Sequence, residues 1–413
     1  MNKGSLLIRN INKLIGIIDK PSSFKKGRAL SSLNTIENAY LLMDKGKIHS
    51  FGKMDDCPEN ADKIIEANGS LVLPAWIDSH THIVFPTTRE MEFIDKIRGL
   101  SYEEIAKRGG GILNTAKKMT DADEDYLYRS AMKRLDEIIG FGTGAVEIKS
   151  GYGLSFDNEI KMLKVIKKIK ETAPIPVKAN FLGAHALPPE YKNKREEYIK
   201  LITDKMLPYI AEHQLADYID VFCDKGFFTV TETDILLKAG AKYGLKPKIH
   251  ANELDTSGGI QTGVKNNAVS VDHLEYTGEE EIEVLKNSNT IPTLLPSTAF
   301  FLRLKYAPAR QMIDAGLGVA LASDYNPGSS PSGNMQFVIS LASIYMKMLP
   351  EEAINATTIN AAYALELQDK LGSISVGKTA NVIITKPLDN IALIPYYFGS
   401  NLVDKMIING MIY

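Results

Sequence analysis

Cysteine is scarce in this chain, and long apolar runs are missing. Only two cysteines occur in 413 residues, which argues against a secreted fold held together by disulfides. No apolar stretch approaches the roughly 18 residues that a membrane-spanning helix needs. The first ten residues also lack the apolar core of a secretory signal. We therefore expect a soluble, cytoplasmic globular protein.

An excess of charge of either sign is missing as well. The chain has 48 Lys and Arg against 50 Asp and Glu, a formal net charge of −2, and its basic residues are interspersed with acids. A protein that binds nucleic acid or an anionic membrane surface would show a basic excess. We therefore expect a small-molecule partner, with neither nucleic acid nor membrane involved.

The two ends of the chain differ in pattern from its middle. Short β-like runs broken by turns occupy the ends, whereas apolar strand candidates alternate with helical stretches between them. The strand candidates are residues 71–78, 145–149, 177–184, 218–222, 247–251, 270–274, 290–295 and 319–322. Helical stretches include 157–172, 196–212 and 231–243, with Asp157 and Thr231 as expected N-caps.

Eightfold alternation of strand and helix predicts an α/β fold with a (β/α)₈ TIM-like barrel. A doubly wound open sheet is the structural alternative. We place the barrel at residues 73–368. The two ends, residues 1–72 and 369–413, are predicted to join in one small β-sandwich domain.

The pair His80 and His82 directly follows the first predicted barrel strand. Because side chains alternate along a strand, both imidazoles are expected to project to the same side and to be able to bind one metal ion. His250 lies at the end of one predicted strand and Asp324 at the end of another, and barrel enzymes build their sites at the carboxyl ends of strands. We therefore predict that these four residues hold one Zn²⁺ or Fe ion with an open position for water.

Glu253 lies three residues past His250, close enough to reach a water molecule at such a metal. A metal of this kind lowers the pKa of water from about 16 towards about 7. We predict Glu253 as the proton shuttle and Asp324 as a second acceptor for the water proton. His273, or the metal itself, could stabilise a developing oxyanion.

Several longer motifs carry a resemblance to a known family. They are residues 109–115 (GGGILNT), 147–154 (EIKSGYGL), 181–191 (FLGAHALPPEY), 220–224 (DVFCD), 272–276 (DHLEY) and 322–331 (ASDYNPGSSP). With the His-x-His pair, these motifs resemble the amidohydrolase superfamily in its mononuclear branch. Lys149 falls on the second strand rather than where two-metal members place their bridging lysine, which favours one metal.

Within the superfamily, the motifs are most similar to those of enzymes that hydrolyse 4-imidazolone-5-propanoate to N-formimidoyl-L-glutamate in histidine degradation. The resemblance implies the metal ligands named above and suggests a homodimer. It also implies a set of substrate- and product-binding residues: Arg89, Tyr102, Tyr152, His185, Glu253, Asn326, Gly328 and Ser329. The guanidinium of Arg89 suits the propanoate carboxylate. The chain departs from the family at Pro86-Thr87-Thr88, where a glycine-rich turn is usual.

The residues alone leave two other functions open. A related deaminase of purines or pyrimidines would keep the metal ligands but would not need Arg89 or Tyr152. A non-enzymatic homologue would typically lose metal ligands, and this chain keeps all of them. Residues 372–379 match the phosphate-loop pattern, but a helix precedes them and a strand follows, the reverse of the order that phosphate binding requires.

Overall fold

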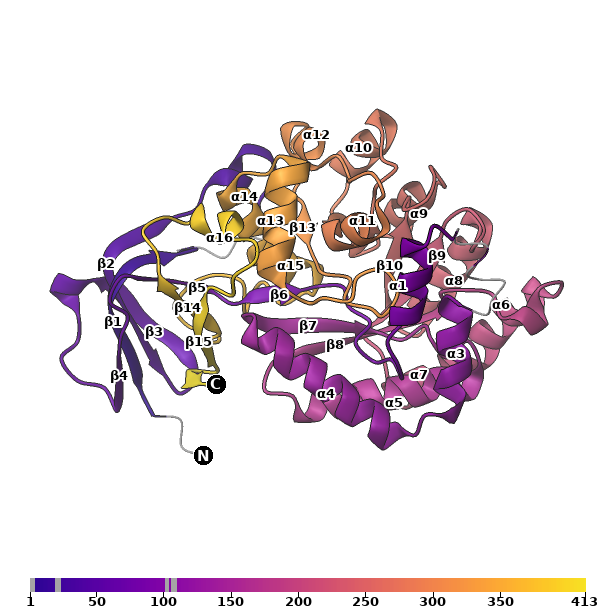
Figure 1. Cartoon of the computed structure of the whole chain (residues 1–413), viewed down its shortest axis with the longest axis horizontal. Helices are drawn as coiled ribbons and strands as arrows, with labels where there is room; N and C mark the ends of the chain where they lie inside the picture. Colours follow the sequence, from indigo (N-terminus) through magenta and orange to yellow (C-terminus); the bar gives the residue numbers. More distant parts are fainter. Residues whose placement is uncertain (1–3, 19–23, 101–103, 105–109) are drawn as a thin grey trace.

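The computed structural model describes residues 4–18, 24–100, 104 and 110–413. Strands from both ends of the chain form one mixed sheet at one side of the molecule, and a parallel barrel with its helices fills the other (Figure 1). The prediction of a TIM-like barrel beside a β layer built from both ends is confirmed, and the open doubly wound sheet is excluded.

The mixed sheet has the strand order β16-β15-β14-β5-β1-β2-β3, with β4 paired to β1. Its side chains form a core of their own, with Ile8, Val72 and Val382 among its buried members. The strands are β1 (Leu6–Ile15), β2 (Thr35–Asp44), β3 (Lys47–Lys53), β4 (Lys63–Glu66), β5 (Ser70–Pro74), β14 (Val382–Pro387), β15 (Val403–Ile408) and β16 (Met411–Ile412).

The barrel strands follow one another in chain order, and each neighbouring pair is parallel. They are β6 (Trp76–Asp78), β7 (Thr143–Lys149), β8 (Val177–Ala184), β9 (Tyr218–Cys223), β10 (Lys246–Ala251), β11 (Ser270–His273), β12 (Ile291–Leu294) and β13 (Ala320–Leu321). The first and last strands meet just past their ends, where the His80 carbonyl accepts from the Asp324 amide at 3.0 Å and the His82 amide donates to Tyr325 at 2.9 Å. Barrel closure therefore brings the predicted ligands of β6 and β13 together.

Helices cover the outside of the barrel (Figure 1). They are α1 (Glu90–Ile97), α3 (Ile112–Asp121), α4 (Glu124–Gly140), α5 (Phe156–Thr172), α6 (Arg195–Leu201), α7 (Leu207–Glu212), α8 (Val230–Lys242), α9 (Gly259–Lys265), α10 (Glu279–Lys286), α11 (Pro296–Leu302), α12 (Ala309–Asp314), α13 (Met335–Met346), α14 (Pro350–Thr357) and α15 (Ile359–Ala364). A short α16 (Leu393–Tyr396) lies between β14 and β15. None of the helices in the described part of the chain has the length and apolarity to span a bilayer.

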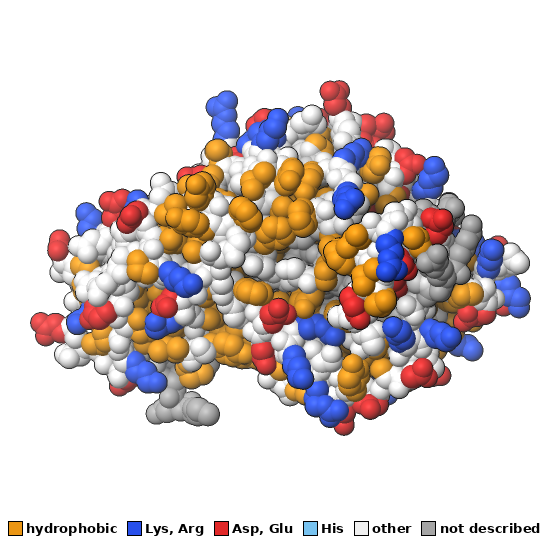
Figure 2. Space-filling model, viewed as in Figure 1, with side chains coloured by type: hydrophobic (Ala, Val, Ile, Leu, Met, Phe, Trp, Pro, Cys, Tyr) orange, Lys and Arg blue, Asp and Glu red, His pale blue; other side chains and the backbone are white. Residues whose placement is uncertain are grey.

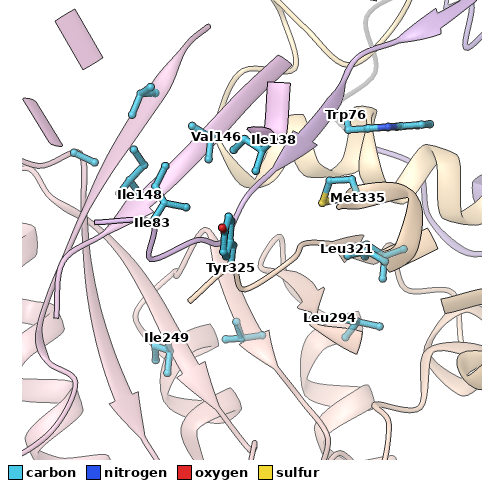
Figure 3. Close-up of a cluster of buried hydrophobic side chains, with 14 of the residues drawn as sticks. Trp76, Ile83, Ile138, Val146, Ile148, Ile249, Leu294, Leu321, Tyr325 and Met335 are labelled. Atoms are coloured by element: carbon cyan, nitrogen blue, oxygen red, sulfur yellow. The ribbon is translucent and has the colours of Figure 1, made fainter. Parts of the chain in front are cut away.

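Side chains alternate along the barrel strands between an apolar outer face and a polar interior. Val146 and Ile148 of β7 belong with Ile138 of α4 to one buried apolar cluster (Figure 3). Their neighbours Glu147 and Lys149 are fully buried and form ion pairs inside the barrel. The two-residue period of a strand thus places a charged layer beneath the carboxyl-end opening.

The predicted strand 71–78 is wrong as a single element. Residues 70–74 pair with β1 and β14 in the mixed sheet, and residues 76–78 begin the barrel. The chain crosses between the sheets at Ala75, whose amide donates to the Asn381 carbonyl, while the next amide, of Trp76, donates to the Gly142 carbonyl. Pro74 has no N–H to continue the first ladder, and a continuous apolar run cannot reveal which sheet each half joins.

Two N-cap predictions also need correction. Ser155 and Thr229 cap α5 and α8, so Asp157 and Thr231 lie inside the first turn instead of at the N-cap. At α8, Glu232 completes a capping box with Thr229. The predicted helical stretch 196–212 is confirmed, with a π-helical turn at Ile202–Met206 between α6 and α7.

Exposed apolar side chains gather on one face of the molecule. Ile344 and Tyr345 of α13, Tyr396 of α16 and the adjacent Phe398 are each more than half exposed. Figure 2 shows an apolar area in its upper middle, where Figure 1 places α13 and α16.

Candidate active site

A cavity of about 540 Å³ opens at the carboxyl ends of the barrel strands. Its deep end is lined by His82, His185, His250, His273 and Asp324, which come from five different strand ends. Its outer wall is more apolar and includes Phe222 at the end of β9, Phe227 after β9, and Phe301 to Leu304 after β12. A polar floor within apolar walls is the usual form of a small-molecule site.

The four predicted metal ligands lie together at this floor. The Nε2 atoms of His80 and His82 are 3.4 Å apart, and each is 3.4 Å from Oδ1 of Asp324. One ring nitrogen each of His80, His82 and His250 lies within 4.8 Å of the others. Residues separated by more than 240 positions in the sequence thus meet around one small volume.

Buried carboxylates orient two of these imidazoles. His80 Nδ1 lies 2.7 Å from Asp272 Oδ2, and His250 Nδ1 lies 3.0 Å from Asp220 Oδ1. Donation from Nδ1 leaves each Nε2 as a lone-pair donor towards the shared volume. Lys149 connects the two carboxylates from below, with Nζ 2.7 Å from Asp220 and 3.6 Å from Asp272.

This arrangement fits a divalent metal ion on three grounds. The donor set is three imidazole nitrogens and one carboxylate oxygen, which suits zinc or iron. His250 Nε2 is buried and has no hydrogen-bond partner in the described part of the protein. Burial, reinforced by Lys149 for His80 and by His185 for His82, also holds the pKa of both imidazoles well below the usual range. They are therefore neutral, as metal binding requires.

Asp324 is held in place by its neighbours and by an unusual backbone. Its Oδ2 accepts from Thr298 Oγ1 of α11 at 2.6 Å, which leaves Oδ1 facing the histidines. Its φ is 53°, in the left-handed region that non-glycine residues occupy only when the surrounding structure imposes it. His273 and Leu274 have φ values of 83° and 71°, so backbone strain occurs at two strand ends of the site.

Glu253 and His273 form a buried acid–base pair beside the metal cluster. Glu253 Oε2 lies 3.7 Å from His273 Nε2. Burial, partly opposed by His273, raises the pKa of Glu253 to about 7. For His273, burial lowers the pKa, but the carboxylates of Glu253 and Glu275 outweigh it and raise the value to about 10. The pair thus combines a carboxyl group that titrates near neutrality with a cationic donor.

Arg89 projects into the outer part of the cavity. It is the N-cap residue of α1, and its Nε donates to Thr115 Oγ1 at 2.8 Å. Its Nη2 is buried without a hydrogen-bond partner among the described residues. Its Nη1 lies against Gly328, where an added Cβ would come within 2.2 Å of it. The guanidinium is therefore fixed, with donor capacity left for a ligand.

Tyr152 and His185 lie between Arg89 and the metal cluster. The guanidinium carbon of Arg89 is 5.5 Å from the centre of the Tyr152 ring, and the His185 ring stacks on His82 at 5.4 Å. His185 Nδ1 donates to the Gly151 carbonyl at 3.0 Å. Burial, with repulsion from His250, lowers the pKa of His185 to about 3, so its Nε2 is a neutral acceptor.

The predicted product-side residues Asn326, Gly328 and Ser329 belong to the loop after β13, and all three line the cavity. The side chain of Asn326 folds this loop, because its Oδ1 accepts from the amides of Gly328 and Ser329, both at 2.8 Å. Its Nδ2 donates to Ser329 Oγ at 2.7 Å. Tyr102 falls outside the described residues.

Sequence reasoning did not assign roles to several residues of the site. Asp220 and Asp272 orient the histidines, Thr298 holds Asp324, Thr115 holds Arg89, and Lys96 of α1 lines the cavity. The charged residues inside buried strands carried a usable signal, because a charge within an apolar strand needs a partner. The sequence offers no comparable signal for Thr115, Thr298 or Lys96.

The fold and this arrangement are those of a metal-dependent hydrolase built on a barrel. Residues 71–412 match the family model described as "Amidohydrolase family". Solved structures with the same fold include a triazine hydrolase variant, with a TM-score of 0.71, 15% identity and coverage of 99% of this chain and 94% of that one. A zinc-bound adenosine deaminase from Xanthomonas campestris has a TM-score of 0.69, with 15% identity over 98% and 92% of the two chains.

Sequence relatives are much closer than these structures. An imidazolonepropionase from Flavobacterium johnsoniae is 55% identical, over 98% of this chain and 99% of the relative. One from Clostridium tetani is 40% identical, over 100% and 99% of the two chains. The chain therefore belongs to the amidohydrolase family and, within it, to the imidazolonepropionases.

Proposed function

We propose that this enzyme hydrolyses the lactam C–N bond of 4-imidazolone-5-propanoate and releases N-formimidoyl-L-glutamate. The observation that carries the proposal is the combination, in one cavity, of a three-histidine, one-aspartate cluster with a fixed guanidinium whose Nη2 has no partner among the described residues. A cyclic amide with a carboxylate tail matches both features. Purine or pyrimidine deamination is not favoured, because no such substrate needs the carboxylate site at Arg89.

We propose that His80, His82, His250 and Asp324 hold one zinc or iron ion. When bound, such an ion supplies a hydroxide at neutral pH and polarises the lactam carbonyl. Glu253 takes the proton from the attacking water and delivers it to the ring nitrogen as the C–N bond breaks. Its pKa near 7 suits both transfers.

The cationic His273 donates a hydrogen bond to the lactam oxygen as negative charge develops there. Arg89 binds the propanoate carboxylate and so fixes the ring over the metal cluster. Tyr152 and His185 line the space between the tail and the ring, and the phenyl rings of the outer wall limit access of bulk water. Asn326, Gly328 and Ser329 form the side of the cavity from which the open-chain product departs.

The location and assembly are further proposals. Both cysteines, Cys57 and Cys223, are free thiols, in keeping with a reducing cytoplasm. Self-association into a homodimer could use the exposed apolar side chains around Tyr345 and Tyr396.

The direct test is an ultraviolet assay of the loss of 4-imidazolone-5-propanoate. We expect turnover by the wild type, a loss of kcat of about 10²–10⁴-fold in Glu253→Gln, and mainly a raised KM in Arg89→Ala. Full activity of Glu253→Gln would refute the proton shuttle. Release of ammonia from guanine or cytosine, with no loss of the imidazolone, would refute the substrate.

A further inference from the structure

The cavity contains a second cation near Arg89. α1 turns one face to the cavity, since Arg89, Glu92, Phe93, Lys96 and Ile97 all line its wall and follow helical spacing. The arginine lies at the start of this face, and the half-buried lysine lies two turns further along it.

Lys96 and Arg89 border the same residue of the loop after β13. Lys96 Nζ donates to the Gly328 carbonyl at 3.2 Å. A Cβ added to Gly328 would lie 2.2 Å from Arg89 Nη1, so the guanidinium lies directly against this glycine. An anion that enters the cavity beside Gly328 is therefore within the field of both charges.

The acid on this helix face is directed elsewhere. Glu92 accepts from the Gly111 amide at 3.1 Å and from Asn114 Nδ2 at 3.2 Å, so its oxygens fasten α1 to the start of α3. Arg89 Nη2 remains without a protein partner among the described residues, and an ammonium has three N–H donors, of which the Gly328 carbonyl takes one. Arg89 and Lys96 thus each keep N–H donors that the hydrogen bonds named above do not use.

We propose that Lys96 is a specificity-determining residue, which completes with Arg89 a two-cation site for the carboxylate tail of the substrate. The inference rests on the proposed function and extends it. Arg89 offers a planar fork to the carboxylate, and Lys96 adds a point charge beside Gly328. Cyclic amides with a neutral tail gain nothing from this pair, so Lys96 selects for an acidic tail.

The test compares kinetics on 4-imidazolone-5-propanoate and on its methyl ester, which lacks the negative charge. For Lys96→Met we expect KM for the acid to rise by about 10-fold with kcat nearly unchanged, as for loss of a hydrogen bond to a charged group. The ester should give the same kcat/KM with both enzymes. Lys96→Arg should restore most of the affinity for the acid, and Lys96→Gln serves as a second charge-removing variant.

Lys118→Met is the matched control. This exposed lysine of α3 bonds to Thr87 Oγ1 at 3.3 Å and does not line the cavity, so KM should stay at the wild-type value. An unchanged KM for the acid in Lys96→Met, or equal losses for acid and ester, would overturn the role of Lys96. A wild type that leaves the acid intact would instead overturn the proposed function and this inference with it.

Discussion

At the scale of single residues, the pKa of Glu253 sets the expected response of activity to pH. Burial raises this pKa to about 7, and a proton shuttle must begin in the carboxylate form. Activity is therefore low where Glu253 is protonated and rises as pH increases through its pKa. A bound metal cation favours the carboxylate, so the acidic limb of kcat/KM is expected at or below about pH 7. A pH profile between 5 and 9 measures it.

The residual activity of Glu253→Gln provides the control for this assignment, because glutamine does not titrate. We expect its profile to lose the acidic limb that the wild type shows. If the acidic limb of the pH profile is unchanged in Glu253→Gln, the group that titrates there is a different one, such as the metal-associated water.

The site residues that could be predicted are those at strand ends. His80, His82, His250 and Asp324 lie at or just past strand ends, and barrel closure brings them together regardless of loop detail. Lys96 could not be found this way, because its position depends on how α1 packs over the opening. A helical lysine looks the same in the sequence whether it faces solvent or a cavity.

At the scale of elements, the polar interior of the strands supports the metal histidines. Asp272 of β11 lies beside His250 of β10 in the parallel register and binds His80 Nδ1, Lys149 Nζ and Ser270 Oγ. Removing this buried carboxylate leaves the His80 imidazole without its partner and takes from Lys149 one of the three carboxylates around it. We expect Asp272→Ala to lower the free energy of unfolding of the metal-free protein by about 3–5 kcal/mol. Urea denaturation followed by circular dichroism measures the change.

Asp125→Ala is the matched control for Asp272→Ala. Asp125 pairs with Lys168 at 2.9 Å on the surface, where water screens the interaction, so no measurable change is expected. If Asp272→Ala and the wild type unfold at the same urea concentration, the charged layer contributes nothing to stability.

The strand–helix alternation was predictable because short runs rich in apolar residues recur between helical stretches along the chain. The sheet to which residues 71–74 belong was not predictable. Their apolar pattern continues unbroken into β6, and only pairing with the distant strands β1 and β14 assigns them to the mixed sheet. To predict the N-caps at Ser155 and Thr229, each would have had to be compared with the other capping candidate two residues later in the sequence.

At the scale of the whole molecule, removal of the metal should lower thermal stability without unfolding the barrel. The apolar core is continuous between strands and helices and does not depend on the cluster of His80, His82, His250 and Asp324. A ligand that binds only the folded state stabilises it by about 2.7 kcal/mol at a concentration 100 times its Kd. We therefore expect a chelator to lower Tm by several degrees and to leave the far-ultraviolet circular dichroism at 25 °C unchanged.

Asp324→Ala separates this loss of metal from a general effect of the chelator. The variant lacks one of the four proposed ligands, so its Tm should respond little to chelation, and returning Zn²⁺ should restore Tm in the wild type only. Elemental analysis before and after chelation gives the metal content of each protein and distinguishes zinc from iron. Equal Tm shifts in the two proteins would contradict the proposed metal site, because a shift that does not need Asp324 cannot come from an ion bound there.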